Sequence, residues 1–134
     1  MRSAAFITTV TASALAAGAA LWVAIPALAA IGGAHTPGAR AAAMVNADGT
    51  VERSTGVTAV RKINAGQYCI ELDPDINAAK TVPVVSKLWN GTGTDIYISS
   101  YNGCGDTARN IFVITTRPAP AGGFADAPFN IVVD

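Results

Sequence analysis

Cys69 and Cys104, the two cysteines of this 134-residue chain, are the first candidates for chemistry. Cys69 lies in the stretch 66-GQYCIELDPDI-76, where apolar residues alternate with more polar ones and Cys69 takes a polar position. A cysteine in such a place is a nucleophile, a metal ligand or half of a disulfide. The other residues of the chain distinguish between these three roles.

A disulfide is the role that the sequence favours. A thiol nucleophile needs a positioned base, and His35, the only histidine, stands in a Gly- and Pro-rich stretch that holds nothing in place. A structural zinc site needs about four ligands, which two cysteines and this histidine do not supply. An even pair of cysteines in an exported chain pairs readily. We therefore expect a Cys69–Cys104 disulfide and no metal site.

The carboxylates give a weaker indication of chemistry. Asp73 and Asp75 flank Pro74 near a turn, and Glu71 faces the same side as Cys69. Aspartates at turns commonly accept hydrogen bonds from backbone amides, and nothing in the chain resembles an EF-hand calcium loop. Spacing alone does not exclude a glycosidase-type carboxylate pair. A small secreted hydrolase using Glu71, Asp73 and Asp75 is therefore an alternative hypothesis.

Three aromatic residues indicate a binding surface. Tyr97 and Tyr101 fall on one face of an expected strand, with Ser99 between them, and Trp89 precedes the loop 90-NGTG-93. If they share an exposed surface, they can stack on sugar rings or on an apolar patch of a partner. The alternative is that they cover a sheet face as ordinary packing. The candidate ligand is an unknown protein or carbohydrate at the cell surface.

The first thirty residues read as an export signal. An uncharged, Ala-rich run follows Arg2 and leads through Pro26 to Ala27-Leu28-Ala29, which fits the A-x-A cleavage pattern. The run is long enough for a retained membrane anchor, but Pro26 and the lack of a basic flank favour cleavage. We predict a bacterial signal peptide over residues 1–29, and a secreted or envelope protein with no stable membrane span.

The charge of the remaining chain excludes several classes of partner. Loss of Arg2 leaves eight basic against nine acidic residues, and they are scattered. Nucleic-acid binding therefore has no electrostatic support. The Gly-rich pieces 102-NGCG-105 and 121-AGG-123 precede no helix, so neither reads as a phosphate loop. We expect no cofactor.

The elements that must position these residues are strands. Residues 30–43 read as a flexible leader of small residues. From 44 to 134, short extended runs alternate with turn residues, and no sustained helical period occurs. This pattern predicts one all-β domain, an antiparallel sandwich or small barrel of about eight strands. The expected runs are 44–46, 50–53, 57–63, 67–73, 81–89, 94–101, 110–116 and 129–133.

The segment 48-DGTVERSTGVTAVRKINAGQYCIELDPDI-76 and the closing 128-PFNIVV-133 carry a family resemblance. They resemble small secreted actinobacterial proteins of unknown function, whose β-rich units also occur appended to phage-tail-like and collagen-like proteins. The matching positions are turn and core residues, so the resemblance implies a fold and no agreed activity. In those units the second cysteine lies nearer the position of Ala78-Ala79 here, so the placement of Cys104 departs from the pattern.

The sequence therefore predicts a secreted, non-enzymatic β-sandwich that acts in surface or envelope interaction. Besides the hydrolase, a second alternative is a structural module that oligomerises through an exposed edge strand, such as the C-terminal 129-FNIVVD-134.

Overall fold

The computed structural model describes residues 33–34, 38–101 and 103–134 of the chain, and eight strands and two short 3₁₀ helices lie in them. The predicted signal peptide and His35 lie outside the described residues. In chain order the elements are β1 (Ala41–Val45), β2 (Val51–Thr55), β3 (Val57–Asn64), β4 (Gln67–Leu72), η1 (Ala78–Lys80), β5 (Val84–Lys87), η2 (Trp89–Gly91), β6 (Asp95–Ile98), β7 (Asn110–Thr116) and β8 (Phe129–Val133).

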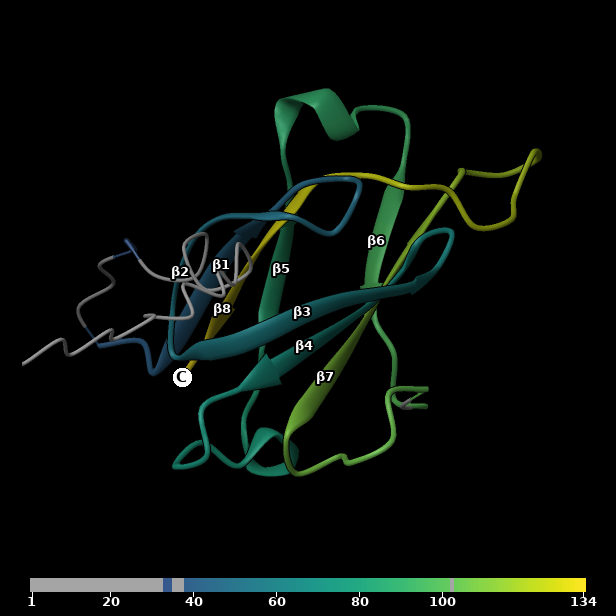
Figure 1. Cartoon of the computed structure of the whole chain (residues 1–134). Helices are drawn as coiled ribbons and strands as arrows, with labels where there is room; N and C mark the ends of the chain where they lie inside the picture. Colours follow the sequence, from purple (N-terminus) through teal and green to yellow (C-terminus); the bar gives the residue numbers. More distant parts are fainter. Residues whose placement is uncertain (1–32, 35–37, 102) are drawn as a thin grey trace, which may run out of the picture.

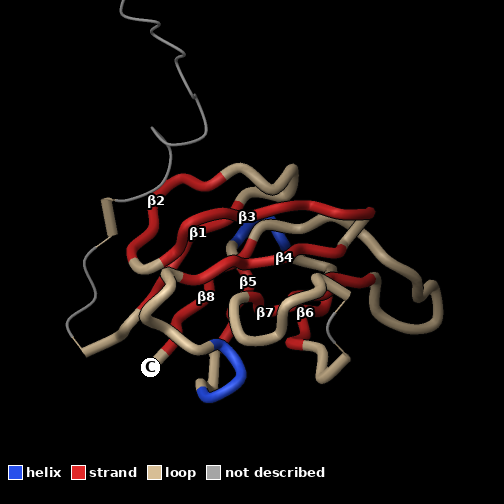
Figure 2. Tube along the Cα trace, turned by 60° about the horizontal axis from the view of Figure 1, so that its bottom comes forward, coloured by secondary structure: helices blue, strands red, loops and turns tan. Residues whose placement is uncertain are grey.

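The strands form two four-stranded antiparallel sheets, in the orders β2-β1-β8-β5 and β3-β4-β7-β6. Figure 1 shows β2, β1 and β8 side by side, with the β5–β6 connection and its helix η2 at the top. Strands and loops make up almost all of the described chain in Figure 2. The prediction of an all-β, sandwich-like fold with about eight strands is thus confirmed.

The two sheets enclose a single core. The inward positions of β4, β7 and β8 are buried, and they alternate with outward ones as the pleat requires. Tyr68 of β4 meets Phe129 of β8 edge to face, with their ring centroids 5.1 Å apart. The Tyr68 hydroxyl donates to the Ala47 carbonyl and accepts from the Ala127 amide, so this buried phenol is fully partnered.

Strand β1 begins at Ala41, three residues before the expected start of the β-domain at Met44. Ala41 and Ala43 are buried against the core, and Ala34 donates a hydrogen bond to the Ser54 carbonyl of β2. The sequence pattern did not show this, because alanine has little strand preference and a run of alanines resembles a linker. In β1 the small side chains fit between the sheets.

Strand β8 is an interior strand. It pairs with β1 on one side and β5 on the other, so the expectation that residues 129–134 form an exposed edge was wrong. Strand β5 is an edge strand and begins directly after Pro83, in keeping with the confinement of proline to edge strands and strand starts. No helix in the part of the chain described here is long and apolar enough to cross a bilayer.

Candidate functional site

The disulfide between Cys69 and Cys104 holds a loop against the outer face of the β3-β4-β7-β6 sheet. Cys69 does point outward, yet its exposure is 0% because this loop covers it. Gly103 lies against the Phe112 ring, where an added Cβ would come within 3.3 Å, and Phe112 is only 5% exposed. The loop and the sheet thus bury a second, smaller apolar layer outside the core.

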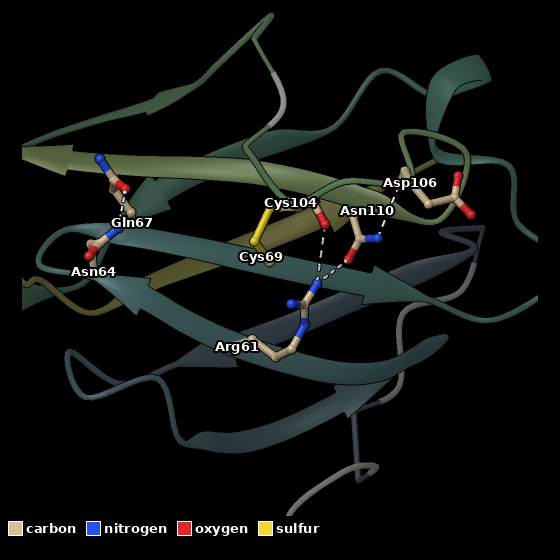
Figure 3. The surroundings of a disulfide bond; sticks show 7 residues. All are labelled: Arg61, Asn64, Gln67, Cys69, Cys104, Asp106 and Asn110. Atoms are coloured by element: carbon tan, nitrogen blue, oxygen red, sulfur yellow. Dashed lines mark hydrogen bonds between the residues drawn. A yellow bond between two sulfur atoms is a disulfide. The ribbon is translucent and has the colours of Figure 1, made fainter.

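Polar contacts fasten the same loop at a second point. The Arg61 guanidinium of β3 donates to the Asn110 side-chain oxygen at 3.3 Å and to the Cys104 carbonyl at 3.5 Å. The Asn110 amide in turn donates to the Asp106 carbonyl. Figure 3 shows Arg61 reaching across β4 toward these two groups beside the disulfide. The cysteine pair and Arg61 therefore have a structural role, which is to hold the covering loop against the sheet.

The carboxylates proposed for hydrolysis lie at the end of β4 and in the turn that follows it. Glu71 accepts a hydrogen bond from Arg109 at 3.2 Å, and this ion pair lies on the outer face. Asp73 and Asp75 follow β4 in a turn, where the Asp75 carbonyl accepts from Arg40. Within residues 33–34, 38–101 and 103–134, no three acidic, cysteine or histidine side chains converge as metal ligands do.

The three predicted aromatic residues are all exposed but come from different parts of the surface. Tyr97 lies within β6 and is 52% exposed. Trp89, 89% exposed, belongs to η2 before β6, and Tyr101, 77% exposed, follows the other end of β6. Figure 1 shows η2 at the top and the chain after β6 at the bottom. Tyr101 was expected on the same strand as Tyr97, but β6 ends at Ile98.

A row of side chains that the sequence did not single out surrounds Tyr97. Strand register places Asn64 opposite Gln67, Gln67 opposite Ile114, and Ile114 opposite Tyr97. Directly opposed residues in antiparallel strands point to the same face. Gln67 lies two residues before the outward-facing Cys69 on β4, so it points outward as well. These four residues, which we name the outer row, therefore cross the whole sheet. The Asn64 amide donates to the Gln67 side-chain oxygen at 3.2 Å (Figure 3).

Phe124 extends the outer row and was also missed. It lies in the long loop after β7, forms an isolated bridge with Thr116, and is 48% exposed. Since Thr116 and Ile114 share the outer face of β7, Phe124 lies beside the row on the β4 side. The sequence carried no signal for this, because a Pro- and Gly-rich loop does not reveal where it docks.

Asp126 anchors the loop that carries Phe124. One carboxylate oxygen binds Lys62 at 2.5 Å, and the other accepts from the Gly66 amide at 2.7 Å. Ala125 exchanges hydrogen bonds with Thr115 through its amide and its carbonyl. The Lys62 contact, and then the Gly66 amide, hold the pKa of Asp126 below its ordinary value. The same contact raises the pKa of Lys62.

This anchor predicts an acid-sensitive contribution to stability. A carboxyl whose pKa is lower in the folded state stabilises the fold above its unfolded pKa, and this contribution is lost as pH falls through the folded pKa. We expect Asp126→Asn to lower the thermal midpoint at pH 6, and the difference from the wild type to shrink as pH falls below 3.8. Melting curves between pH 6 and pH 2 measure this. A difference that stays constant with pH would contradict the assignment.

The opposite sheet offers a shallow hollow of about 250 Å³ on its outer face. It is lined by small, apolar or uncharged side chains and one cation, among them Ala42, Met44, Arg53, Ser86, Asn130 and Val132. The residues that line this hollow include no aromatic ring and no two amide side chains that bond to each other. The outer row is the stronger candidate for a binding site.

Comparison with protein-family models, with curated proteins and with solved structures gives no match for this chain.

Proposed function

We propose that this protein is a secreted, non-enzymatic binding module that attaches to a ligand at the bacterial cell surface. Its kinship with the small secreted actinobacterial proteins that it resembles is part of this proposal. The ligand is a protein or a carbohydrate, since the balanced, scattered charge gives nucleic-acid binding no electrostatic support.

Two observations support export. The sequence of residues 1–29 has the layout of a cleavable signal peptide. The Cys69–Cys104 disulfide is the kind of bond that forms and persists in an oxidising compartment.

The exposure of the aromatic residues carries the binding proposal. Trp89, Tyr97 and Tyr101 are 89%, 52% and 77% exposed, which is far more than packing against a sheet would leave. Isolated exposed apolar residues are normal, but Tyr97 stands in the outer row beside a further exposed ring, Phe124, and Trp89 and Tyr101 add one ring at each end of β6. Rings with a polar tip suit a surface that is wet when free and covered when bound.

The hydrolase alternative has less support. Glu71 is engaged by Arg109, and Tyr68 and Asp126, whose pKa values are shifted, act as loop anchors in the described structure. Shifted groups facing a cleft would be the expected sign of catalysis.

A cosedimentation experiment tests the proposed function. The purified protein is mixed with bacterial cell envelopes, alongside the triple variant Trp89→Ala, Tyr97→Ala, Tyr101→Ala. We expect binding of the wild type and at least about tenfold weaker binding of the variant, since each ring contact contributes about 0.5–1.5 kcal/mol. No binding by the wild type, or equal binding by both, would contradict the proposal.

A further inference from the structure

We propose that the outer row, together with Phe124, binds a neutral polysaccharide chain. This inference rests on the proposed function and narrows it, because it names the ligand class and the part of the surface that holds it.

The composition of the row suits sugar. Two amides stand at one end and an exposed tyrosine ring at the other, with Ile114 between them. A primary amide offers donors and acceptors, and the bond between Asn64 and Gln67 uses one group from each. Among the described residues, neither amide side chain makes a second hydrogen bond. A sugar ring presents hydroxyls on its rim and C–H groups on its faces, which match amides and aromatic faces respectively.

The charges around the row indicate a neutral ligand. No member of the row is charged, and the cations of the neighbouring strand β3 are engaged. Arg61 donates to Asn110 and to the Cys104 carbonyl, and Lys62 binds Asp126. The Asp95 Oδ1 atom, at the start of β6, is 3.9 Å from the Lys87 Nζ atom. An anionic polymer or an acidic lipid surface requires several available basic groups. The row itself carries none, and Arg117, whose guanidinium lies next to Gly123 beside Phe124, is a single cation.

The spacing of the two rings indicates a chain longer than one sugar. Tyr97 lies one strand from Ile114 on the β6 side, and Phe124 lies one strand away on the β4 side and two residues further along. At the usual strand spacing and rise per residue, their Cα atoms are about 12 Å apart. A monosaccharide cannot cover both rings, whereas consecutive sugars of a polysaccharide can.

The test compares intact actinobacterial cell walls with walls whose proteins have been digested by protease. The variants are Tyr97→Ala, Phe124→Ala and Gln67→Ala, with Val84→Ala as control. Val84 is 64% exposed and lies on the opposite sheet. We expect the wild type to bind digested walls, each outer-row or Phe124 variant to bind about two- to tenfold more weakly, and Val84→Ala to bind like the wild type. Thermal melts check folding. Tyr97→Leu and Phe124→Leu, which keep an apolar side chain without the ring, replace the corresponding alanine variants if these unfold.

The outcomes separate this inference from the proposed function. Binding to intact but not to digested walls overturns the polysaccharide and leaves a surface-binding module with a protein ligand. Binding to neither preparation overturns both proposals. Binding to digested walls with equal affinities for the row variants and Val84→Ala overturns the placement of the site.

Discussion

Replacing both Cys69 and Cys104 by alanine is expected to lower the free energy of unfolding by about 3–4 kcal/mol. The bond closes a loop of 35 residues, and in the chain-entropy account it stabilises the fold by restricting the unfolded chain. That is a large share of the roughly 5–15 kcal/mol of a whole domain. The loss is increased because the covering loop also buries Phe112, which is 5% exposed with the loop in place. Urea unfolding followed by fluorescence measures the change.

The control for this prediction is the oxidation state of the purified wild type. Intact mass after alkylation under non-reducing conditions should show a protein two hydrogens lighter than the dithiol form and carrying no alkyl group. The double variant and the reduced wild type should then unfold at similar urea concentrations. A loss below about 1 kcal/mol would mean that contacts such as Arg61 with Asn110 hold the loop without the covalent bond.

The fold was predictable where apolar residues alternate with polar ones or form a short continuous run. The alternation in 129-FNIVV-133 and the continuous apolar run in 110-NIFVITT-116 both gave strand bounds that agree with β8 and β7. The prediction failed where the same sequence pattern occurs in two different structural settings. Ala41–Ala43 resembles a linker but fills β1, and 129–133 resembles an edge but is covered on both sides. Sequence order gives no information on which strands become neighbours.

The candidate site was predictable only in part, for a related reason. Tyr97 was found because an aromatic residue on a polar strand face stands out. Asn64, Gln67 and Phe124 come from β3, β4 and a distant loop, and only the strand register and the docking of that loop bring them beside Tyr97. The position of Cys69 on an outward face was correct, but its complete burial was not foreseeable, because the covering loop is formed by the disulfide itself.

Gly66→Ala is expected to destabilise the fold strongly, by about 2–5 kcal/mol. Gly66 closes the turn between β3 and β4 with a φ of +63°, where a side chain costs about 1–2 kcal/mol. An added Cβ would also stand 2.3 Å from the Thr115 carbonyl oxygen and 2.8 Å from the Ala125 amide nitrogen. These are backbone atoms that cannot rotate away, so the strands must shift, at about 1–3 kcal/mol more. The turn residue was evident from 64-NAG-66, but the close approach was not.

Gly122→Ala is the matched control, because it separates the two costs. Gly122 has nearly the same φ, +61°, and no atom lies within 4 Å of an added Cβ. We expect it to lose only the conformational part, about 1–2 kcal/mol, in urea unfolding of both variants side by side. Equal losses of unfolding free energy would show that the loop carrying Ala125 moves away from the added Cβ at little cost. A larger loss at Gly66 would show that this turn holds the loop firmly, and Phe124 would then be displaced with Ala125. Gly66→Ala should in that case also weaken binding at the outer row, while Gly122→Ala should leave it unchanged.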